Sequence, residues 1–251
     1  MAAFLRIALG SLAAVGLAGG LAWVMLSPTP PRRELDAALV MDRSGTISGD
    51  GCTDAQDIGR ALVNAAKADA LSVQLYGITD RAHADQPALA GEPVVLANHT
   101  VSLDDGPDAR LREQKRAVAD ILARCRLVQP TQQSPILAAV RTALAQLKGQ
   151  PPRPGRVPML IIRTDGLEEH DPQLVRALHG SRGRPSKDAR AKDKLDNTGV
   201  RTVLCGTAQR APHRGWEPSP EVVKAAWERE FKSPVTVLPY CHGLDQTLAS
   251  R

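Results

Sequence analysis

Residues 35–46 have the sequence LDAALVMDRSGT, a short apolar run that ends at an aspartate and continues into small and hydroxyl-bearing residues. A short apolar run bounded by turn-forming residues is typical of a strand buried inside a sheet. Asp42 and the hydroxyls of Ser44 and Thr46 follow this run directly. The stretch therefore predicts a buried strand with oxygen-bearing side chains clustered at its carboxyl end.

Strand and helix patterns alternate along the rest of the chain. The chain has 251 residues and is 43% hydrophobic, which is enough for one large domain with a substantial core. Strands that alternate with helices favour an α/β, doubly wound fold, in which a mainly parallel six-stranded sheet carries helices on both faces. The predicted strands are 35–41, 71–78, 93–103, 157–163, 200–204 and 235–238, and the predicted helices are 54–69, 108–126, 134–147, 172–178 and 219–232.

Two of these helices have a recognisable start. Ser134 followed by Pro135 fits an N-cap with a proline in the first turn, and the helix at 219–232 begins in the same way with a Ser-Pro pair. The apolar residues near its start are predicted to face the core: Val222, Val223, Ala226 and Trp227.

The first residues of the chain differ in kind from the rest. Ile7–Leu26 carries no charge and is long enough to cross the hydrocarbon core of a bilayer as one helix. We interpret residues 1–26 as a transmembrane signal-anchor, or as a long signal peptide, because small residues near its end also fit a cleavage site. The proline-rich residues 27–34 are predicted to form a stiff linker, and residues 35–251 the domain.

The cysteines indicate the compartment. All four, Cys52, Cys125, Cys205 and Cys241, lie in the predicted domain, and none forms a CxxC pair. An even number of this kind favours two disulfides in an oxidising compartment, so we expect a periplasmic or extracellular domain, secreted if the apolar segment is cleaved. Buried thiols in a cytosolic domain are the alternative, and the arginines that flank the apolar run do not favour an outside domain.

The formal net charge of +5 raises the question of nucleic acid. Aromatic residues make up only 3% of the chain, too few for a base-stacking surface. The basic excess is also local, because it lies between Arg176 and Lys194 in a polar stretch that we interpret as a solvated loop. We therefore expect no nucleic-acid partner. An electrostatic surface for anionic lipid or nucleic acid is the alternative, and steep salt dependence would reveal it.

Three segments bring polar side chains to predicted strand ends or helix starts. Asp42, Ser44 and Thr46 follow the first strand, Asp165 follows the strand at 157–163, and Ser134 opens a helix. In open α/β sheets, ligands bind outside the carboxyl ends of the strands, so these groups are expected to share one rim. Two carboxylates and three hydroxyls, without histidine or cysteine, suit Mg²⁺ rather than zinc.

On these residues the chain resembles the von Willebrand factor A-like family and its metal-ion-dependent adhesion site. That site has the pattern D-x-S-x-S/T, a later threonine often within T-P-I, and an aspartate in a hydrophobic-T-D-G segment. This sequence has D-R-S-G-T from Asp42, S-P-I from Ser134, and I-I-R-T-D-G ending at Gly166. The resemblance runs from residue 35 to about residue 241 and implies the Rossmann-like fold of that family.

The resemblance also implies a function. Ser44, Thr46 and Ser134 would approach Mg²⁺, or Mn²⁺ or Ca²⁺ in its place, and Asp42 and Asp165 would hold the ion partly through water. Ser134 stands where the family usually has threonine, and Thr131 is a rival for that role. A carboxylate from a partner protein would complete the coordination. The expected protein is a membrane-tethered binding domain, not an enzyme, without a small-molecule substrate.

In the arrangement that the resemblance implies, the cysteines can be paired. Cys205 and Cys241 follow strands expected to be neighbours, whereas Cys52 and Cys125 lie in segments that lead into the metal loops. Of the three possible connectivities, we predict Cys52–Cys125 and Cys205–Cys241.

An enzymatic alternative uses the same residues. The sequence L-V-M-D-R-S-G-T also resembles the D-x-D-G-T signature of haloacid dehalogenase-like phosphatases, in which Asp42 would be the nucleophile. That chemistry needs a second carboxylate as general acid and base, and here the position is Ser44.

Overall fold

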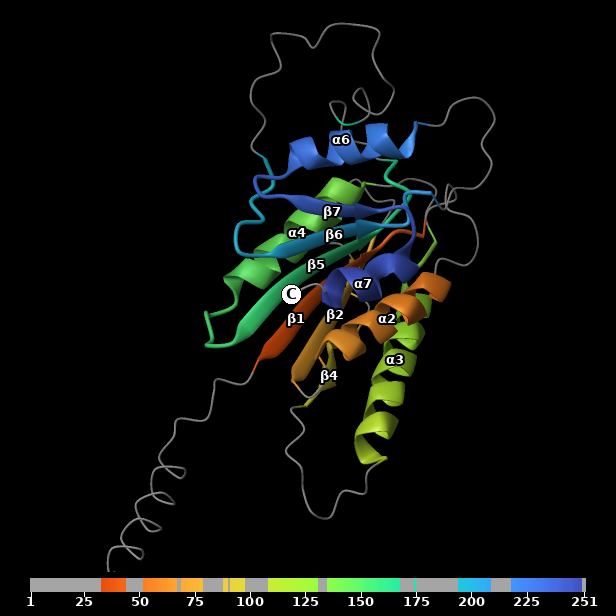
Figure 1. Cartoon of the computed structure of the whole chain (residues 1–251), viewed down its shortest axis with the longest axis vertical. Coiled ribbons are helices and arrows are strands. Elements are labelled where there is room, and N and C mark those ends of the chain that lie inside the picture. Colours follow the sequence, from red (N-terminus) through yellow and green to blue (C-terminus); the bar gives the residue numbers. More distant parts are fainter. Residues whose placement is uncertain are drawn as a thin grey trace, which may run out of the picture. The chain divides into compact units, whose positions relative to one another are not determined.

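A mainly parallel sheet forms the centre of the domain (Figure 1). Strand β1 (Glu34–Met41) lies in the middle and pairs in parallel with β2 (Ala70–Gly77) and β5 (Arg156–Arg163). Beyond β5, the strands β6 (Arg201–Cys205) and β7 (Val235–Leu238) continue the parallel order. The stretch that opens with Leu35 is thus a buried strand, as its mainly apolar residues predict, and the structure places it at the centre of the sheet.

The computed structural model describes residues 33–43, 52–66, 69–78, 88–89, 91–97, 108–130, 135–167, 174, 194–208 and 218–249. All of them belong to one compact unit, Arg33–Arg251. Within these ranges no helix has the length and apolarity needed to cross a membrane. The predicted membrane segment, residues 7–26, lies outside the described residues.

Two short antiparallel strands share the outer edge of β2. Strand β3 (Ala88–Leu89) pairs with Tyr76–Gly77, and β4 (Val94–Leu96) pairs with Leu71–Val73. Among the described residues the sheet therefore has seven strands, in the order β3-β2-β1-β5-β6-β7 with β4 beside β2, rather than the six predicted. Because β3 and β4 lie on the same edge, the sheet is still six positions wide. Strand β4 is the described part of the predicted strand 93–103.

Helices cover both faces of the sheet, which confirms the doubly wound architecture (Figure 1). Side chains alternate along β1, so that Leu39 faces one layer of helices and Val40 faces the other. The first layer contains α2 (Cys52–Ala66), α3 (Ala109–Leu127) and α7 (Leu244–Ala249) with the preceding 3-10 turn (Cys241–Gly243), and the second contains α4 (Ile136–Gly149) and α6 (Pro220–Glu230).

The helix starts correct the sequence analysis in detail. Helix α4 begins at Ile136, and Pro135, predicted to lie in the first turn, is its N-cap because its ψ of 65° is not helical. Helix α6 begins as predicted, since Ser219 caps it by accepting a hydrogen bond from the amide of Val222. The side chain of Val222, however, is 36% exposed, whereas Val223 is fully buried. The predicted helix 172–178 lies outside the described residues apart from Leu174.

Candidate functional site

Two buried aspartates follow the carboxyl ends of adjacent parallel strands. Met41 of β1 lies opposite Arg163 of β5, and the ladder continues one step further, because the amide of Asp42 donates to the carbonyl of Arg163 at 2.9 Å. Asp42 and Asp165 are both fully buried. The structure thus places these predicted site residues at one rim. The other predicted donors, Ser44, Thr46, Ser134 and the alternative Thr131, lie outside the described residues.

Thr164 orients the carboxylate of Asp42. Its hydroxyl donates to Oδ2 of Asp42 at 2.8 Å and accepts from the amide of Gly166 at 3.0 Å. Oδ1 of Asp165 accepts from the amide of Leu167 at 2.9 Å. These bonds hold the turn after β5 in one conformation and direct both carboxylates. The sequence identifies Thr164 only as part of the T-D-G motif, because the strand register that brings it beside Asp42 is not visible in the sequence.

Arg163 joins three elements behind the candidate site. It is 2% exposed, and its Nε and a terminal nitrogen lie 2.8 and 2.7 Å from Oδ2 of Asp54 in the first turn of α2. Its other terminal nitrogen donates to the carbonyl of Asp42 at 2.9 Å. One buried guanidinium therefore connects β5, the residue after β1 and the start of α2. A buried charge of this kind requires such a partner, and the sequence alone did not identify it.

Gly166 allows the turn after β5 to pack against α6. Its φ is +82°, a backbone conformation that side chains disfavour, and an added Cβ would lie 2.5 Å from Cγ1 of Val223. The indole Nε1 of the buried Trp227 donates to the carbonyl of Gly166 at 3.0 Å. The glycine of the T-D-G motif is therefore required by close contact with α6, and Trp227 anchors the same turn.

Both predicted disulfides are confirmed. Cys52 pairs with Cys125 at a Cα–Cα distance of 5.7 Å, and Cys205 pairs with Cys241 at 4.9 Å. The second disulfide lies beside the candidate site, because the carbonyl of Cys205 accepts from the amide of Thr164.

The first disulfide connects the segments that lead into two of the predicted metal loops. Residues 44–51 run between Arg43 and Cys52, and residues 131–134 follow the end of α3. Cys52 is bonded to Cys125 of α3, and the guanidinium of Arg43 donates to the carbonyls of Cys125 and Val128. The described ends of both loops are thus held together at the end of α3.

The donor set suits a hard cation. Within the described part of the chain, no three His, Cys, Asp or Glu side chains come together in a way that could hold a metal ion. The candidate set contains only two carboxylates, and its other donors are hydroxyls outside the described residues. Carboxylate and hydroxyl oxygens fit Mg²⁺, Mn²⁺ or Ca²⁺, and the absence of sulfur and imidazole does not fit zinc.

No protein-family model and no curated protein matches the sequence. Similar solved structures include an aerotolerance-related membrane protein from Bacteroides fragilis, with 10% identity, a TM-score of 0.42, and coverage of 87% of this chain and 96% of that one. The manganese-loaded TRAP protein of Plasmodium vivax has 13% identity, a TM-score of 0.40 and coverage of 87% and 72%. A von Willebrand factor type A protein from Catenulispora acidiphila has 14% identity, a TM-score of 0.40, and coverage of 86% of this chain and 41% of that one. At these identities and TM-scores the likeness is one of fold and transfers no residue role.

Proposed function

We propose that this chain is a membrane-tethered, extracytoplasmic protein-binding domain that holds an acidic residue of a partner protein through a divalent cation. The proposed ligands are Asp42, Ser44, Thr46, Asp165 and Ser134, with Thr131 as the alternative to the last. One observation carries the proposal: Asp42 and Asp165 are fully buried after adjacent parallel strands. Parallel sheets of this type bind ligands at that rim.

The residues of this chain orient the donors. The hydroxyl of Thr164 and the amide of Leu167 each direct one carboxylate. Because Arg163 bonds to Asp54 and to the backbone of Asp42, it holds the rim in place. A bound Mg²⁺, Mn²⁺ or Ca²⁺ would supply a Lewis-acidic centre whose remaining coordination position accepts a carboxylate from outside. With only two protein carboxylates, a divalent ion would keep water among its ligands, and a carboxylate from an acidic partner would replace that water.

The proposed location outside the cytoplasm has two supports. Two disulfides within one domain are typical of an oxidising compartment. The apolar run at residues 7–26 has the length of a membrane span. Protease treatment of cells whose outer envelope has been opened but whose cytoplasmic membrane is intact, followed by mass measurement of the surviving chain, tests both the orientation and cleavage of this segment. Protection of the domain in these cells that is lost on full lysis would contradict a location outside the cytoplasm.

Calorimetric titration of the full chain with Mg²⁺ and Mn²⁺ tests the metal site. We expect one binding event in the natural chain and none in Asp42→Asn or Asp165→Asn. Asp120→Asn is the matched control, because Asp120 is an exposed carboxylate on α3 that is not among the proposed ligands. Absence of metal binding by the natural chain, or equal binding by all variants, refutes the site.

Capture of the partner tests the interaction itself. The full chain is used as bait for membrane extracts in Mg²⁺ and again in EDTA, with Asp165→Asn as the metal-site control. A partner retained only in Mg²⁺, and only by the natural chain, supports the proposal. Hydrolysis of a generic aryl phosphate that is lost in Asp42→Asn would instead favour the phosphatase alternative.

A further inference from the structure

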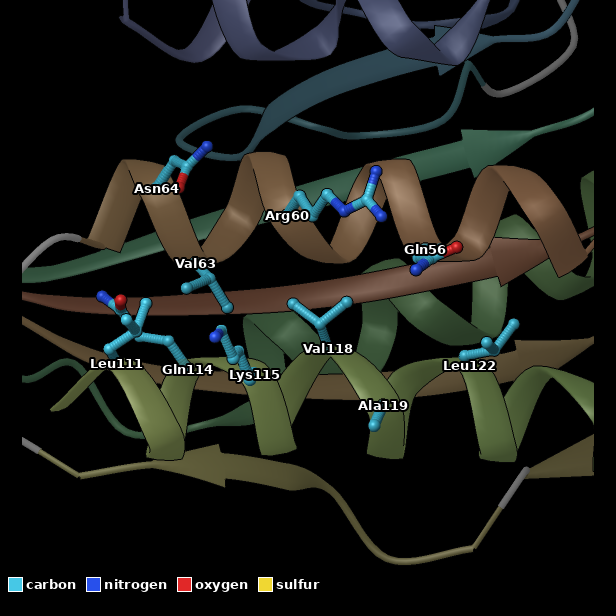
Figure 2. Close-up of a pocket in the computed structure, with 10 residues that line it drawn as sticks. All are labelled: Gln56, Arg60, Val63, Asn64, Leu111, Gln114, Lys115, Val118, Ala119 and Leu122. Carbon is cyan, nitrogen blue, oxygen red and sulfur yellow. The ribbon is translucent and has the colours of Figure 1, made fainter. Parts of the chain in front are cut away.

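A groove of about 480 Å³ runs along the seam between α2 and α3. Figure 2 shows side chains from both helices gathered along this seam. The groove is separate from the candidate metal ligands, none of which lines it. Its lining residues are Gln56, Arg60, Val63 and Asn64 from α2, and Leu111, Gln114, Lys115, Val118, Ala119 and Leu122 from α3.

The groove exists because the two helices meet through a narrow stripe. A Cβ at Gly59 would lie only 3.3 Å from Ile121, so the helices approach closely at this point. Helix α3 buries only Ala117, Ile121 and Cys125 on its inner stripe. Val118 and Leu122 beside this stripe therefore remain only partly buried. Apolar surface is left along the seam that the fold itself does not cover.

The lining combines this apolar floor with a positively charged rim. The partly buried Val118 and Leu122 supply the floor above the almost fully buried Val63, and Leu111 at one end is 48% exposed. Among the lining residues the only charged side chains are Arg60 and Lys115, and both are positive. Amide side chains complete the rim. Such a surface matches a ligand with an apolar face between acidic residues.

The charge of α3 strengthens this match. The helix carries six basic and two acidic residues over Ala109–Leu127. Arg60 on α2 does have a nearby carboxylate, Asp57 at 3.3 Å, but both side chains are well exposed, at 56% and 36%. An exposed pair of this kind is weak and leaves the arginine accessible to another anion. Basic residues therefore outnumber acidic ones on the two helices that form the groove.

We propose that the α2–α3 groove is a second binding site, which takes an acidic amphipathic helix of a partner protein. A helix whose apolar residues recur at i, i+3, i+4 and i+7 would lay them on Leu111, Val118 and Leu122, as in other helix-in-groove complexes. Its flanking glutamates or aspartates would face Arg60 and Lys115. This site goes beyond the proposed function and needs no metal.

Fluorescence anisotropy with a defined peptide tests the groove. The probe is a labelled synthetic peptide of about 14 residues, with leucines at helical spacing and glutamates beside them. It is added to the full chain in phosphatidylcholine nanodiscs, in EDTA, so that the result does not depend on the candidate metal site. We expect saturable binding that weakens about tenfold in Arg60→Glu/Lys115→Glu, because two favourable charge contacts become repulsive.

A matched variant and a matched peptide keep the test specific. Arg112→Glu/Arg116→Glu makes the same change in charge on exposed positions of α3 outside the groove, and its affinity is expected to stay within about twofold of the natural chain. A peptide with lysines in place of the glutamates should bind the Arg60→Glu/Lys115→Glu variant more tightly than the natural chain. Circular dichroism checks that each variant is folded.

Three outcomes overturn the proposal. In the first, the acidic peptide does not bind. In the second, both double variants weaken peptide binding equally, which would mean unspecific attraction to a basic surface. In the third outcome, vesicles containing phosphatidylserine bind through these same basic residues and the peptide does not, which would make the surface a lipid contact.

Discussion

Replacing Arg163 by methionine removes the guanidinium that joins β5 to Asp42 and α2 while retaining much of the side chain's apolar volume. Arg163 is 2% exposed, and it contributes the paired nitrogens 2.7 and 2.8 Å from Asp54 and the donor 2.9 Å from the carbonyl of Asp42. Asp54 is itself only 7% exposed. The variant therefore leaves a buried carboxylate without its guanidinium partner and a backbone carbonyl without this donor.

The expected loss follows from these contacts. Removing one partner of a buried ion pair lowers the free energy of unfolding by about 3–5 kcal/mol. The bond to the carbonyl of Asp42 adds about 1 kcal/mol, so Arg163→Met should lose roughly 4–6 kcal/mol in all. In Arg163→Met/Asp54→Leu neither charge of this pair remains, and the loss should shrink to about 1–2 kcal/mol.

Urea unfolding followed by tryptophan fluorescence, with both disulfides kept oxidised, measures these free energies in a double-mutant cycle. The control is Arg60→Met, which removes an exposed ion pair with Asp57 and should change stability by less than about 1 kcal/mol. If Arg163→Met loses no more than this control, the buried pair does not stabilise the rim. If the double variant is less stable than Arg163→Met, the loss does not come from the carboxylate left behind, and the reasoning is refuted.

The remaining predictions concern the turn after β5 and one buried tyrosine. Thr164→Val should weaken metal binding about tenfold, because it removes one charge-assisted hydrogen bond to Asp42, whereas Thr164→Ser should keep the affinity of the natural chain. Calorimetric titration with Mg²⁺ compares the two variants. Equal affinities would show that the Thr164 hydroxyl does not orient the carboxylate of Asp42. Gly166→Ala should lose about 2–4 kcal/mol in urea unfolding, because the residue has a φ of +82° and the new Cβ would press on Val223, so an unchanged midpoint would contradict the geometry. Burial, and secondly the negative charge of a nearby aspartate, raises the pKa of Tyr76 well above its ordinary value. Because the folded state holds this proton more tightly, its contribution to stability is complete below pH ~10 and is lost as pH rises through the folded pKa. In Tyr240→Phe, which leaves Tyr76 as the chain's single tyrosine, tyrosinate absorbance should stay low past pH ~10 until the protein unfolds, and an ordinary titration would disprove the burial effect.

Local patterns in the sequence determined the architecture and the positions of the two candidate carboxylates. An apolar run such as residues 37–41 predicts a strand buried on both faces, because every side chain of the run is apolar. Asp42 and Asp165 could be assigned to strand ends for the same reason, since they directly follow those runs. The disulfide pairing needed more, namely the arrangement of segments that the family resemblance implied.

Only the tertiary structure decided which distant side chains meet. Arg163 and Asp54 are 109 positions apart, and Thr164 and Asp42 are 122 apart, so their bonds depend on strand register and on how α2 packs. The exposed orientation of Val222 on α6, which the sequence missed, likewise depends on how that helix is rotated against the sheet. Helical periodicity identifies an apolar stripe, but neighbouring elements determine which part of that stripe is covered, and that information lies in long-range contacts rather than in any local segment.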